Sequence, residues 1–366
     1  MLLLRQIRAT GSSLNITTPF HHFAFDVMGE IAFGHSFSLI GDSTPGGDQA
    51  HIPALVSQGI SMLRYFTPVP WVCQLCFSIA PYVPFISQKW NKGMEWAAMM
   101  CDTRLARDTT PENTGEANGQ QPQVDAFSRF IVSARRDQDS KSLDRLALYG
   151  DAYVIIVAGS HTTAGTLTMM SFELARRPHL QAELRDEIMK SAAMIADGSG
   201  GSTFSETGAA EALEKLPFLN ACINETLRLY PQVPTGGIRQ TTEKGIFIGE
   251  TFIPPQTVIV APRWSIGRLK SAFVRPNEFA PERWTTKPDM VKDARAFNAF
   301  GAGRHMCPGK QFGMMEVRMA IAIIVSNFEF GISSSGKREN QALDDFVDAF
   351  TAFPGDLELV FKPTTM

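Results

Sequence analysis

Residues 297–320 read FNAFGAGRHMCPGKQFGMMEVRMA and set one cysteine, Cys307, between a glycine-rich turn and a periodic apolar run. Pro308 follows the cysteine, and proline is favoured at the first position of a helix, so we expect Cys307 at the cap of a long helix. The unpaired N–H groups and positive dipole end of that helix would favour a thiolate by roughly 0.3–1 kcal/mol. Arg304 and Lys310 add positive charge. The stretch therefore favours an anionic sulfur.

Three interpretations of this stretch compete. A dinucleotide-binding loop is rejected, because Met306 stands where the third glycine of such a loop would lie and no apolar strand precedes it. A catalytic nucleophile needs a histidine base, and the sequence does not say whether His305 reaches the sulfur. A buried structural cysteine is the usual case for an arbitrary cysteine, but it leaves the neighbouring glycines and proline unexplained. The residues alone leave open whether Cys307 is structural, nucleophilic or the ligand of a metal.

The composition is that of an ordinary soluble globular protein. The chain has 366 residues, is 44% hydrophobic and has a formal net charge of -3, so it is long enough to bury a large core. It has no long Lys/Arg stripe, which excludes nucleic acid as a partner. Five cysteines form a sparse set that is typical of reduced thiols in the cytosol.

The periodicity along the chain is mostly helical. Residues 245–260, GIFIGETFIPPQTVIV, are the exception and predict a β-hairpin that turns at Gly249 and Glu250. A second short strand is predicted at LELVF, residues 357–361. We expect a mainly α fold with a small β portion, organised as a single domain over residues 1–366.

Two uncharged stretches are long enough to be considered as membrane spans. Residues 65–88 contain four prolines, each of which removes a backbone donor, so a surface segment dipping into a bilayer is favoured there over a spanning helix. Residues 152–172 permit a spanning helix, but residues 160–163, Ser-His-Thr-Thr, put polar groups at its centre. A helix with this polar notch suits the middle of a large core that faces a bound group.

The motif around Cys307 resembles the haem-binding signature of the cytochromes P450, particularly those of the fungal microsomal type. Phe300, Gly303, Cys307 and Gly309 match the pattern Phe-x-x-Gly-x-Arg-x-Cys-x-Gly, with His305 at the arginine position. The resemblance implies that Cys307 is the axial thiolate of haem b, iron protoporphyrin IX, and that His305 holds a haem propionate.

Further motifs follow in the order found in that family. The sequence NETLR supplies Glu225 and Arg228, and PERW supplies Arg283; the resemblance implies that these three residues form an interlocked structural network behind the haem. Periodicity alone predicts otherwise, because an apolar stripe on residues 216–230 places Glu225 and Arg228 on the opposite, solvated face. Arg239 matches a family position whose side chain commonly pairs with a haem propionate. The alternative interpretation is that Arg239 is an exposed charge beside a strand.

The polar notch resembles the oxygen-activation motif of the same family. In AGSHTT, Thr162 matches the threonine that helps deliver protons during oxygen activation, Gly159 gives the helix room to open, and His161 replaces the usual acid. A histidine titrates near neutrality and can relay protons. The structural alternative is that Ser160 and Thr162 bond back to preceding helix carbonyls and bend the helix.

The resemblance implies a haem-thiolate monooxygenase that inserts one atom of dioxygen into an apolar organic substrate. Electrons would come from NADPH-cytochrome P450 reductase, with cytochrome b5 as a further donor. Two alternatives are a truncated, non-catalytic haem-binding fragment and a haem-thiolate isomerase or dehydratase. The match to the family's pattern begins only near the family's helix D/E region. We therefore expect no N-terminal anchor in this chain. For the complete protein we expect the cytosolic face of the endoplasmic reticulum membrane, with residues 65–88 contacting the lipid.

Overall fold

The computed structural model describes five long stretches of the chain and a few isolated positions. They are residues 13–40, 84–108, 145–196, 206–333 and 338–364, with the isolated positions 5, 7, 75, 78 and 79. The chain groups into two compact units, the first formed by Met1–Gln6 and Thr18–Ala164 and the second by Ile7–Thr17 and Gly165–Met366. The predicted membrane-contacting stretch, residues 65–88, lies largely outside the described residues. The expectation of a single domain stays a prediction.

The first unit is helical where it is described. It contains α2 (Thr17–Phe33) from its second residue on, α5 (Pro84–Asp108) and α7 (Arg145–Ala175) up to Ala164. Helix α2 packs closely on α7, because a side chain added at Gly159 would run into Met28. The α5 and α7 helices are joined by Tyr149, whose hydroxyl donates to Asp102 over 2.9 Å.

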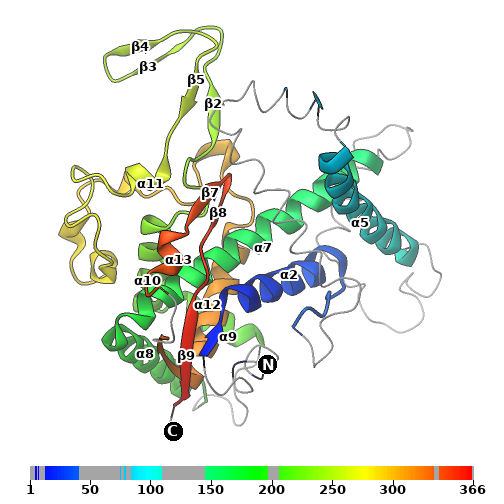
Figure 1. The fold of residues 1–366 in the computed structure, drawn as a ribbon. Helices are drawn as coiled ribbons and strands as arrows, with labels where there is room; N and C mark the ends of the chain where they lie inside the picture. The colour runs from blue at the N-terminus through cyan, green and yellow to red at the C-terminus, as the bar shows by residue number, and fades with distance from the viewer. Residues whose placement is uncertain are drawn as a thin grey trace. The chain divides into compact units, whose positions relative to one another are not determined.

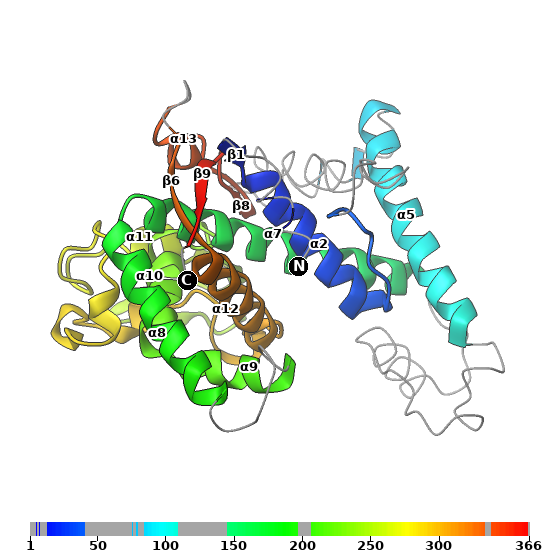
Figure 2. The same ribbon diagram turned by 90° about the horizontal axis from the view of Figure 1, so that it is seen from below.

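Helices α8 (Pro178–Ala196), α9 (Glu206–Glu214), α10 (Pro217–Leu229) and α12 (Lys310–Asn327) form the main body of the second unit. They contact one another and run side by side in Figure 2. The start of α10 is fixed by a carboxylate from α8: the backbone N–H groups of Phe218 and Leu219 donate to Glu187 over 2.8 and 2.9 Å. Such a partner satisfies donors that a helix N-terminus leaves unpaired.

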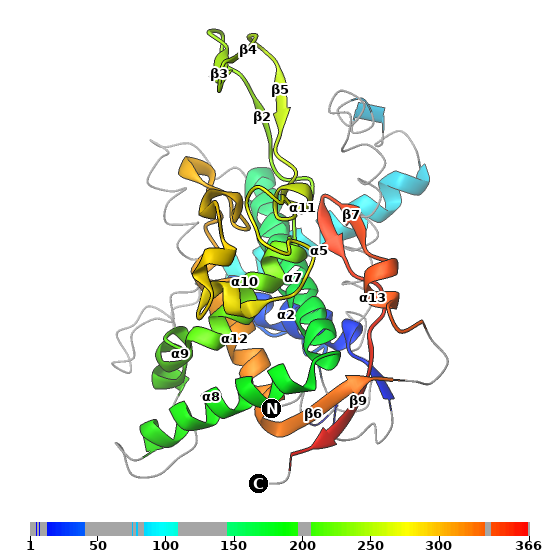
Figure 3. The ribbon, with the colours of Figure 1, turned by 90° about the vertical axis from the view of Figure 1, so that its left-hand side faces the viewer.

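Short antiparallel sheets complete the second unit. The strand β9 (Glu358–Pro363) lies between β1 (Ser13–Asn15) and β6 (Phe328–Ile332), as Figure 3 shows for β6 and β9. The pairs are β2 (Ile238–Gln240) with β5 (Val258–Val260), β3 (Ile246–Ile248) with β4 (Thr251–Ile253), and β7 (Val347–Ala349) with β8 (Thr351–Phe353). The remaining short helical elements are α11 (Arg263–Ile266), α13 (Gln341–Asp344), η3 (Pro281–Trp284), η4 (Pro288–Met290), η5 (Ala294–Ala296) and η6 (Gly303–His305).

The predicted hairpin is confirmed. Gly249 turns the chain with a φ of 60°, and Phe247 pairs with Phe252 across the two strands, with ring centroids 5.1 Å apart. The hairpin projects away from the helices of its unit in Figure 1. The predicted strand near the C-terminus is confirmed as β9.

One expectation about the cysteine is wrong. Helix α12 begins at Lys310 with Gly309 as its N-cap, so Pro308 is not its first residue and Cys307 is not its cap. Residues 307–310 form a turn instead, in which the backbone N–H of Lys310 donates to the carbonyl of Cys307 over 3.4 Å. Cys307 therefore precedes the helix by three residues. Within the described stretches, no helix combines the length and apolarity needed to cross a bilayer.

Candidate cofactor site

The loop from Phe300 to Gly309 closes on itself around Cys307. The backbone N–H of Cys307 donates to the carbonyl of Phe300 over 2.8 Å, which ties the cysteine to the start of the loop. Gly301 and Gly303 have φ angles of 77° and 70°, a left-handed conformation that a side chain would make costly. The glycines of the motif are therefore required by the loop's geometry. The closed loop leaves the Cys307 thiol exposed and outside any disulfide.

Two arginines bring positive charge to this loop. Arg263 follows strand β5 and is half-buried, and its Nη2 lies 3.5 Å from the position that a Cβ would occupy at Gly301. Burial lowers the pKa of Arg263, the nearby positive charge of Arg239 lowers it further, and Cys307 raises it. Arg263 thus lies within electrostatic range both of Arg239 and of the Cys307 sulfur.

Of the remaining motif residues, His305 and Gly309 belong to this loop, and Arg239 lies on a strand within electrostatic range of Arg263. Arg239 is exposed on β2, where its Nη1 donates to the carbonyl of Ile238 over 2.9 Å. His305 is exposed in η6, directly before the cysteine turn. Gly309 lies close enough that a Cβ there would come within 3.9 Å of the Cys307 sulfur. An accessible thiol, flanked by small residues and by cationic side chains, has the donor chemistry to bind the iron of haem and its carboxylates.

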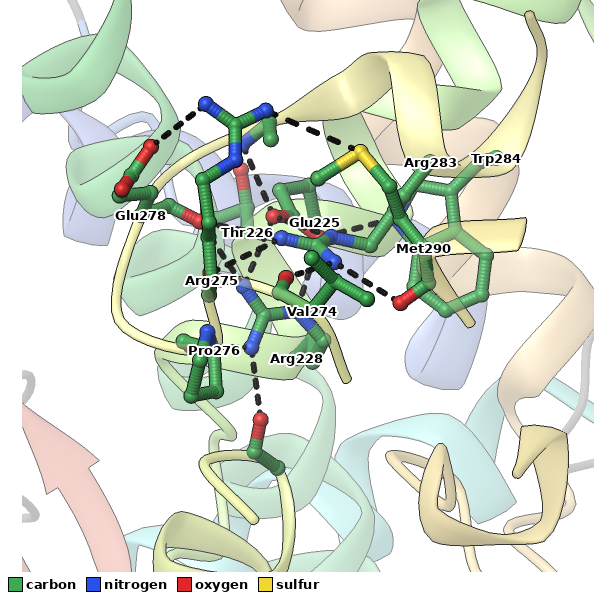
Figure 4. A network of polar contacts seen from close by, with 12 residues as sticks. Glu225, Thr226, Arg228, Val274, Arg275, Pro276, Glu278, Arg283, Trp284 and Met290 are labelled. Atoms are coloured by element: carbon green, nitrogen blue, oxygen red, sulfur yellow. Dashed lines mark hydrogen bonds and ion pairs between the residues drawn. The ribbon is translucent and has the colours of Figure 1, made fainter. Parts of the chain in front are cut away.

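Behind the loop, Glu225 accepts five hydrogen bonds (Figure 4). Arg228 binds its two oxygens through Nε and Nη2, each over 2.8 Å. Arg283 donates from Nε over 2.8 Å, Trp284 from Nε1 over 2.9 Å, and Ala280 from its backbone over 2.9 Å. The side chains of both ion pairs, Arg228–Glu225 and Arg283–Glu225, are 0% exposed.

The two guanidinium groups place their remaining N–H groups on backbone carbonyls. Arg228 donates to the carbonyls of Gly267, Pro276 and Glu278, and Arg283 donates to those of Val274, Arg275, Glu278 and Met290. The cluster thereby fastens α10 to the extended segment that leads toward the cysteine loop.

Trp284 connects this cluster to the loop. Its indole N–H donates to Glu225, and its ring lies 4.7 Å from the ring of Phe297, three residues before the loop begins. The interpretation of Glu225 and Arg228 as a solvated surface pair is wrong, because both side chains are fully buried. The periodicity of α10 did not predict this burial, because the groups that Glu225 and Arg228 bind outside α10 lie far away in the sequence.

The polar notch of α7 belongs to the first unit, whereas Cys307 and the other motif residues belong to the second. Ser160 donates to the carbonyl of Ile156 over 2.6 Å, and Thr162 donates to that of Ala158 over 2.7 Å. This is the back-bonding that the structural alternative predicts. The oxygen of each hydroxyl keeps its capacity to accept a hydrogen bond.

His161 is 0% exposed, and its ring packs against two rings of α2. The ring centroids of His21 and Phe25 lie 5.2 and 5.7 Å from that of His161, both edge-on. Burial lowers the pKa of His161 to about 3, and His21 contributes in the same direction. His161 is therefore neutral in the folded protein near neutral pH.

Sequence reasoning missed Arg263 and His21. Arg263 follows β5, which pairs with β2, and the backbone N–H of Trp264 donates to the carbonyl of Pro234. The predicted hairpin was the nearest signal in the sequence, but it did not extend to this pairing. No signal in the sequence pointed to His21, since its contact with His161 depends on how two distant helices pack.

A family model described as Cytochrome P450 matches residues 2–349 of the chain. Among the similar curated proteins, "Cytochrome P450 monooxygenase orf5" of Eupenicillium brefeldianum is 34% identical over 95% of this chain and 64% of its own length. "Tryprostatin B 6-hydroxylase" of Aspergillus fumigatus is 33% identical over 91% of this chain and 55% of its own length. The chain thus spans less than two thirds of either relative.

A solved structure, described as the crystal structure of the cytochrome P450DA heme domain, resembles the whole of this chain. The TM-score is 0.72 at 16% sequence identity, and the match covers 71% of that structure's chain. At this identity the likeness establishes the fold alone, a mainly helical architecture with small sheets.

Proposed function

The chain belongs to the cytochrome P450 family, and from that premise we propose that the complete protein is a haem-thiolate monooxygenase. It takes an apolar organic substrate, dioxygen, two electrons and two protons, and yields the substrate with one inserted oxygen atom together with water. The electrons come from NADPH-cytochrome P450 reductase, or from cytochrome b5, docking on the Cys307 side of the protein. The observation that carries the proposal is the exposed, unbridged thiol of Cys307 in its closed glycine loop.

When bound, haem supplies the redox centre at which dioxygen is reduced and split. The chain's own residues hold and tune that group. Cys307 provides the thiolate ligand, and Arg263 contributes positive charge near the sulfur. His305, Arg239 and Arg263 are the cationic or titratable side chains proposed to bind the propionates, since charge-assisted hydrogen bonds to carboxylates are short and strong.

The buried cluster of Glu225, Arg228 and Arg283 has a structural role in this proposal. It fixes the segment that carries Trp284, and Trp284 in turn packs on Phe297, which shortly precedes the cysteine loop. A ligand that must keep one position relative to a metal needs such support from the residues behind it. Thr162 and His161 handle protons during oxygen reduction, with Thr162 as a hydroxyl donor and acceptor and His161 as a relay.

Membrane association belongs to the same proposal. Residues 65–88, with their apolar and proline-rich sequence, would contact the lipid surface of the endoplasmic reticulum on its cytosolic side. An apolar substrate would be supplied from that lipid.

The test is a carbon monoxide difference spectrum of the reduced protein, recorded for this chain and for the complete protein. We expect the Soret band at the position typical of thiolate ligation in the complete protein and its loss in Cys307→Ser. Cys101→Ala, which removes another unbridged thiol, is the matched control and keeps the band. Persistence of the band in Cys307→Ser would refute the ligand assignment. NADPH consumption coupled to product formation in the presence of reductase separates a monooxygenase from an isomerase, a dehydratase or an inert haem protein.

A further inference from the structure

The buried His161 of α7 touches a second histidine that none of the family motifs includes. The ring of His21, on α2, lies edge-on to that of His161, with centroids 5.2 Å apart and planes inclined by 66°. Phe25, one turn further along α2, contacts the same ring. All three residues belong to the first unit, so the contact does not depend on how the two units are arranged.

The two histidines differ in their access to water. His161 is 0% exposed, whereas His21 as a residue is only half-buried. The Nδ1 atom of His21 is nevertheless buried and, within the described residues, has no hydrogen-bond partner. His21 is therefore half-buried, carries a buried polar atom, and lies with its ring against one that water does not reach. A buried nitrogen without a partner is costly unless it has a use.

We infer that His21 is the outer member of a two-imidazole path that connects His161 with solvent protons. The inference rests on the proposed proton role of His161 and adds the residue through which that proton arrives. Neutral imidazole carries a proton on one ring nitrogen and accepts one at the other, which suits it to pass protons along a line.

The transfer balances without a change of net charge. A rotation of one ring first brings a nitrogen of His21 into hydrogen-bond distance of a nitrogen of His161. A proton from water then binds the outer nitrogen of His21, and the proton on its other nitrogen moves to His161. His161 then releases its own proton from its opposite nitrogen. Both rings end neutral in their alternative tautomers, and no electrons move.

The electrostatics of the pair agree with transfer between neutral rings. Burial lowers the pKa of His21 to about 4, and the neighbouring His22 acts in the same direction. The pKa of His22 itself is lowered by burial and raised by Asp26, which lies one turn further along α2. A stable imidazolium is therefore disfavoured at His21 and at His161 near neutral pH, and the tautomeric route does not require one.

Solvent exchange of the His161 ring N–H provides a direct test. Nuclear magnetic resonance of the complete, [15N]histidine-labelled protein in its reduced carbon monoxide form reports on individual ring nitrogens, and this chain contributes seven of its histidines. His21→Phe keeps an aromatic ring against His161 but removes both nitrogens. We expect the exchange rate of the His161 ring proton to fall at least tenfold. His22→Phe, one residue along the same helix, is the matched control and leaves the rate unchanged.

Catalysis gives a second readout. In His21→Phe the fraction of NADPH electrons that ends in hydrogen peroxide rises, and the solvent deuterium isotope effect on turnover increases, while the thiolate Soret band keeps its amplitude. His21→Gln keeps a polar side chain but cannot pass a proton between two ring nitrogens, so it behaves as His21→Phe. If His21→Phe does not fold, His21→Gln is compared with the wild type in its place.

The two proposals fail in different ways. Absence of the thiolate band in the wild-type protein would overturn the proposed function, while the exchange measurement would still report on the pair. Equal His161 exchange rates in the wild type and in the two His21 variants would overturn the path, even with a normal band. An equal loss in His22→Phe would also overturn it, because the effect would then belong to the helix rather than to His21.

Discussion

At the scale of single residues, the charge of Glu225 decides whether two buried arginines are tolerated. Its carboxylate is the common partner of Arg228 and Arg283, and all three side chains are removed from water. We expect Glu225→Gln, which keeps the shape but removes the charge, to lower the free energy of unfolding by about 3–5 kcal/mol, because it leaves two guanidinium groups buried without a counter-charge. Urea denaturation of the same chain measures the change.

Arg275 and Glu278 offer a matched control for that substitution. They form an ion pair with the same spacing of three residues and an N–O distance of 3.0 Å, but their side chains are 47% and 58% exposed. Glu278→Gln should cost only about 0.2–1 kcal/mol, since an exposed pair gains little over its interactions with water. Equal losses in Glu225→Gln and Glu278→Gln would contradict the structural role given to the buried cluster.

Substituting Arg263 tests the cofactor hypothesis while leaving the proposed ligand, Cys307, unchanged. If its charge stabilises the thiolate and a propionate, Arg263→Gln should weaken haem retention about 10–100-fold, the range typical of residues that support a metal ligand. Haem transfer to apomyoglobin measures the loss rate. Arg295→Gln is the control, because Arg295 is exposed and pairs with Asp293; Arg263→Lys should restore part of the retention. Equal loss rates in the Arg263 and Arg295 variants would remove Arg263 from the site.

These residues show where the sequence was informative and where it was not. The motif around Cys307 sufficed to recognise the family by resemblance, and its glycines take the left-handed conformations that the closed loop requires. Glu225 was misjudged from periodicity, since the residues that bury it come from η3 and from the segment before it. Arg263 and His21 went unnoticed because they act through partners distant in the chain.

At the scale of elements, two of the three glycines of α7, Gly150 and Gly159, stand in different surroundings. A Cβ at Gly159 would run into the side chain of Met28 on α2, whereas nothing lies within 4 Å of a Cβ at Gly150. We expect Gly159→Ala to destabilise the protein by about 1–3 kcal/mol through overpacking. Gly150→Ala should stabilise it by up to about 1 kcal/mol, as alanine does in an open helical position. Thermal unfolding midpoints distinguish the two, and a stabilising Gly159→Ala would show that α2 and α7 do not pack closely.

Local sequence signals predicted some elements and misplaced others. The hairpin of β3 and β4 was found because a Gly-Glu turn between two apolar triplets is determined locally. The start of α12 was misplaced, because Pro308 suits a turn as well as a first helical position, and only the hydrogen bond from Lys310 to the carbonyl of Cys307 selects the turn. The cap that Glu187 provides for α10 comes from another helix and leaves no local signal.

At the scale of the whole molecule, the buried histidine pair makes stability depend on pH. The pKa values of His21 and His161 are lowered to about 4 and about 3 in the folded chain, against an ordinary value of 6.5. Below pH 6.5 the unfolded chain therefore binds protons at these positions that the folded chain does not, and acid favours unfolding. At pH 5, which is 1.5 units below the ordinary value, each histidine costs about 2 kcal/mol, hence about 4 kcal/mol for both.

The contribution of the pair can be isolated from that of other groups by substitution. Urea denaturation at pH 7 and at pH 5 gives the loss of unfolding free energy between the two pH values. We expect this loss to be about 2 kcal/mol larger for the wild type than for His161→Phe, because the variant has lost one of the two groups that resist protonation. Above pH 6.5 both histidines are neutral in either state, so the difference between the two proteins should no longer change with pH. The same decrease in both proteins between pH 7 and pH 5 would mean that His161 is protonated as readily in the folded chain as in the unfolded one, and that its ring is not buried against His21.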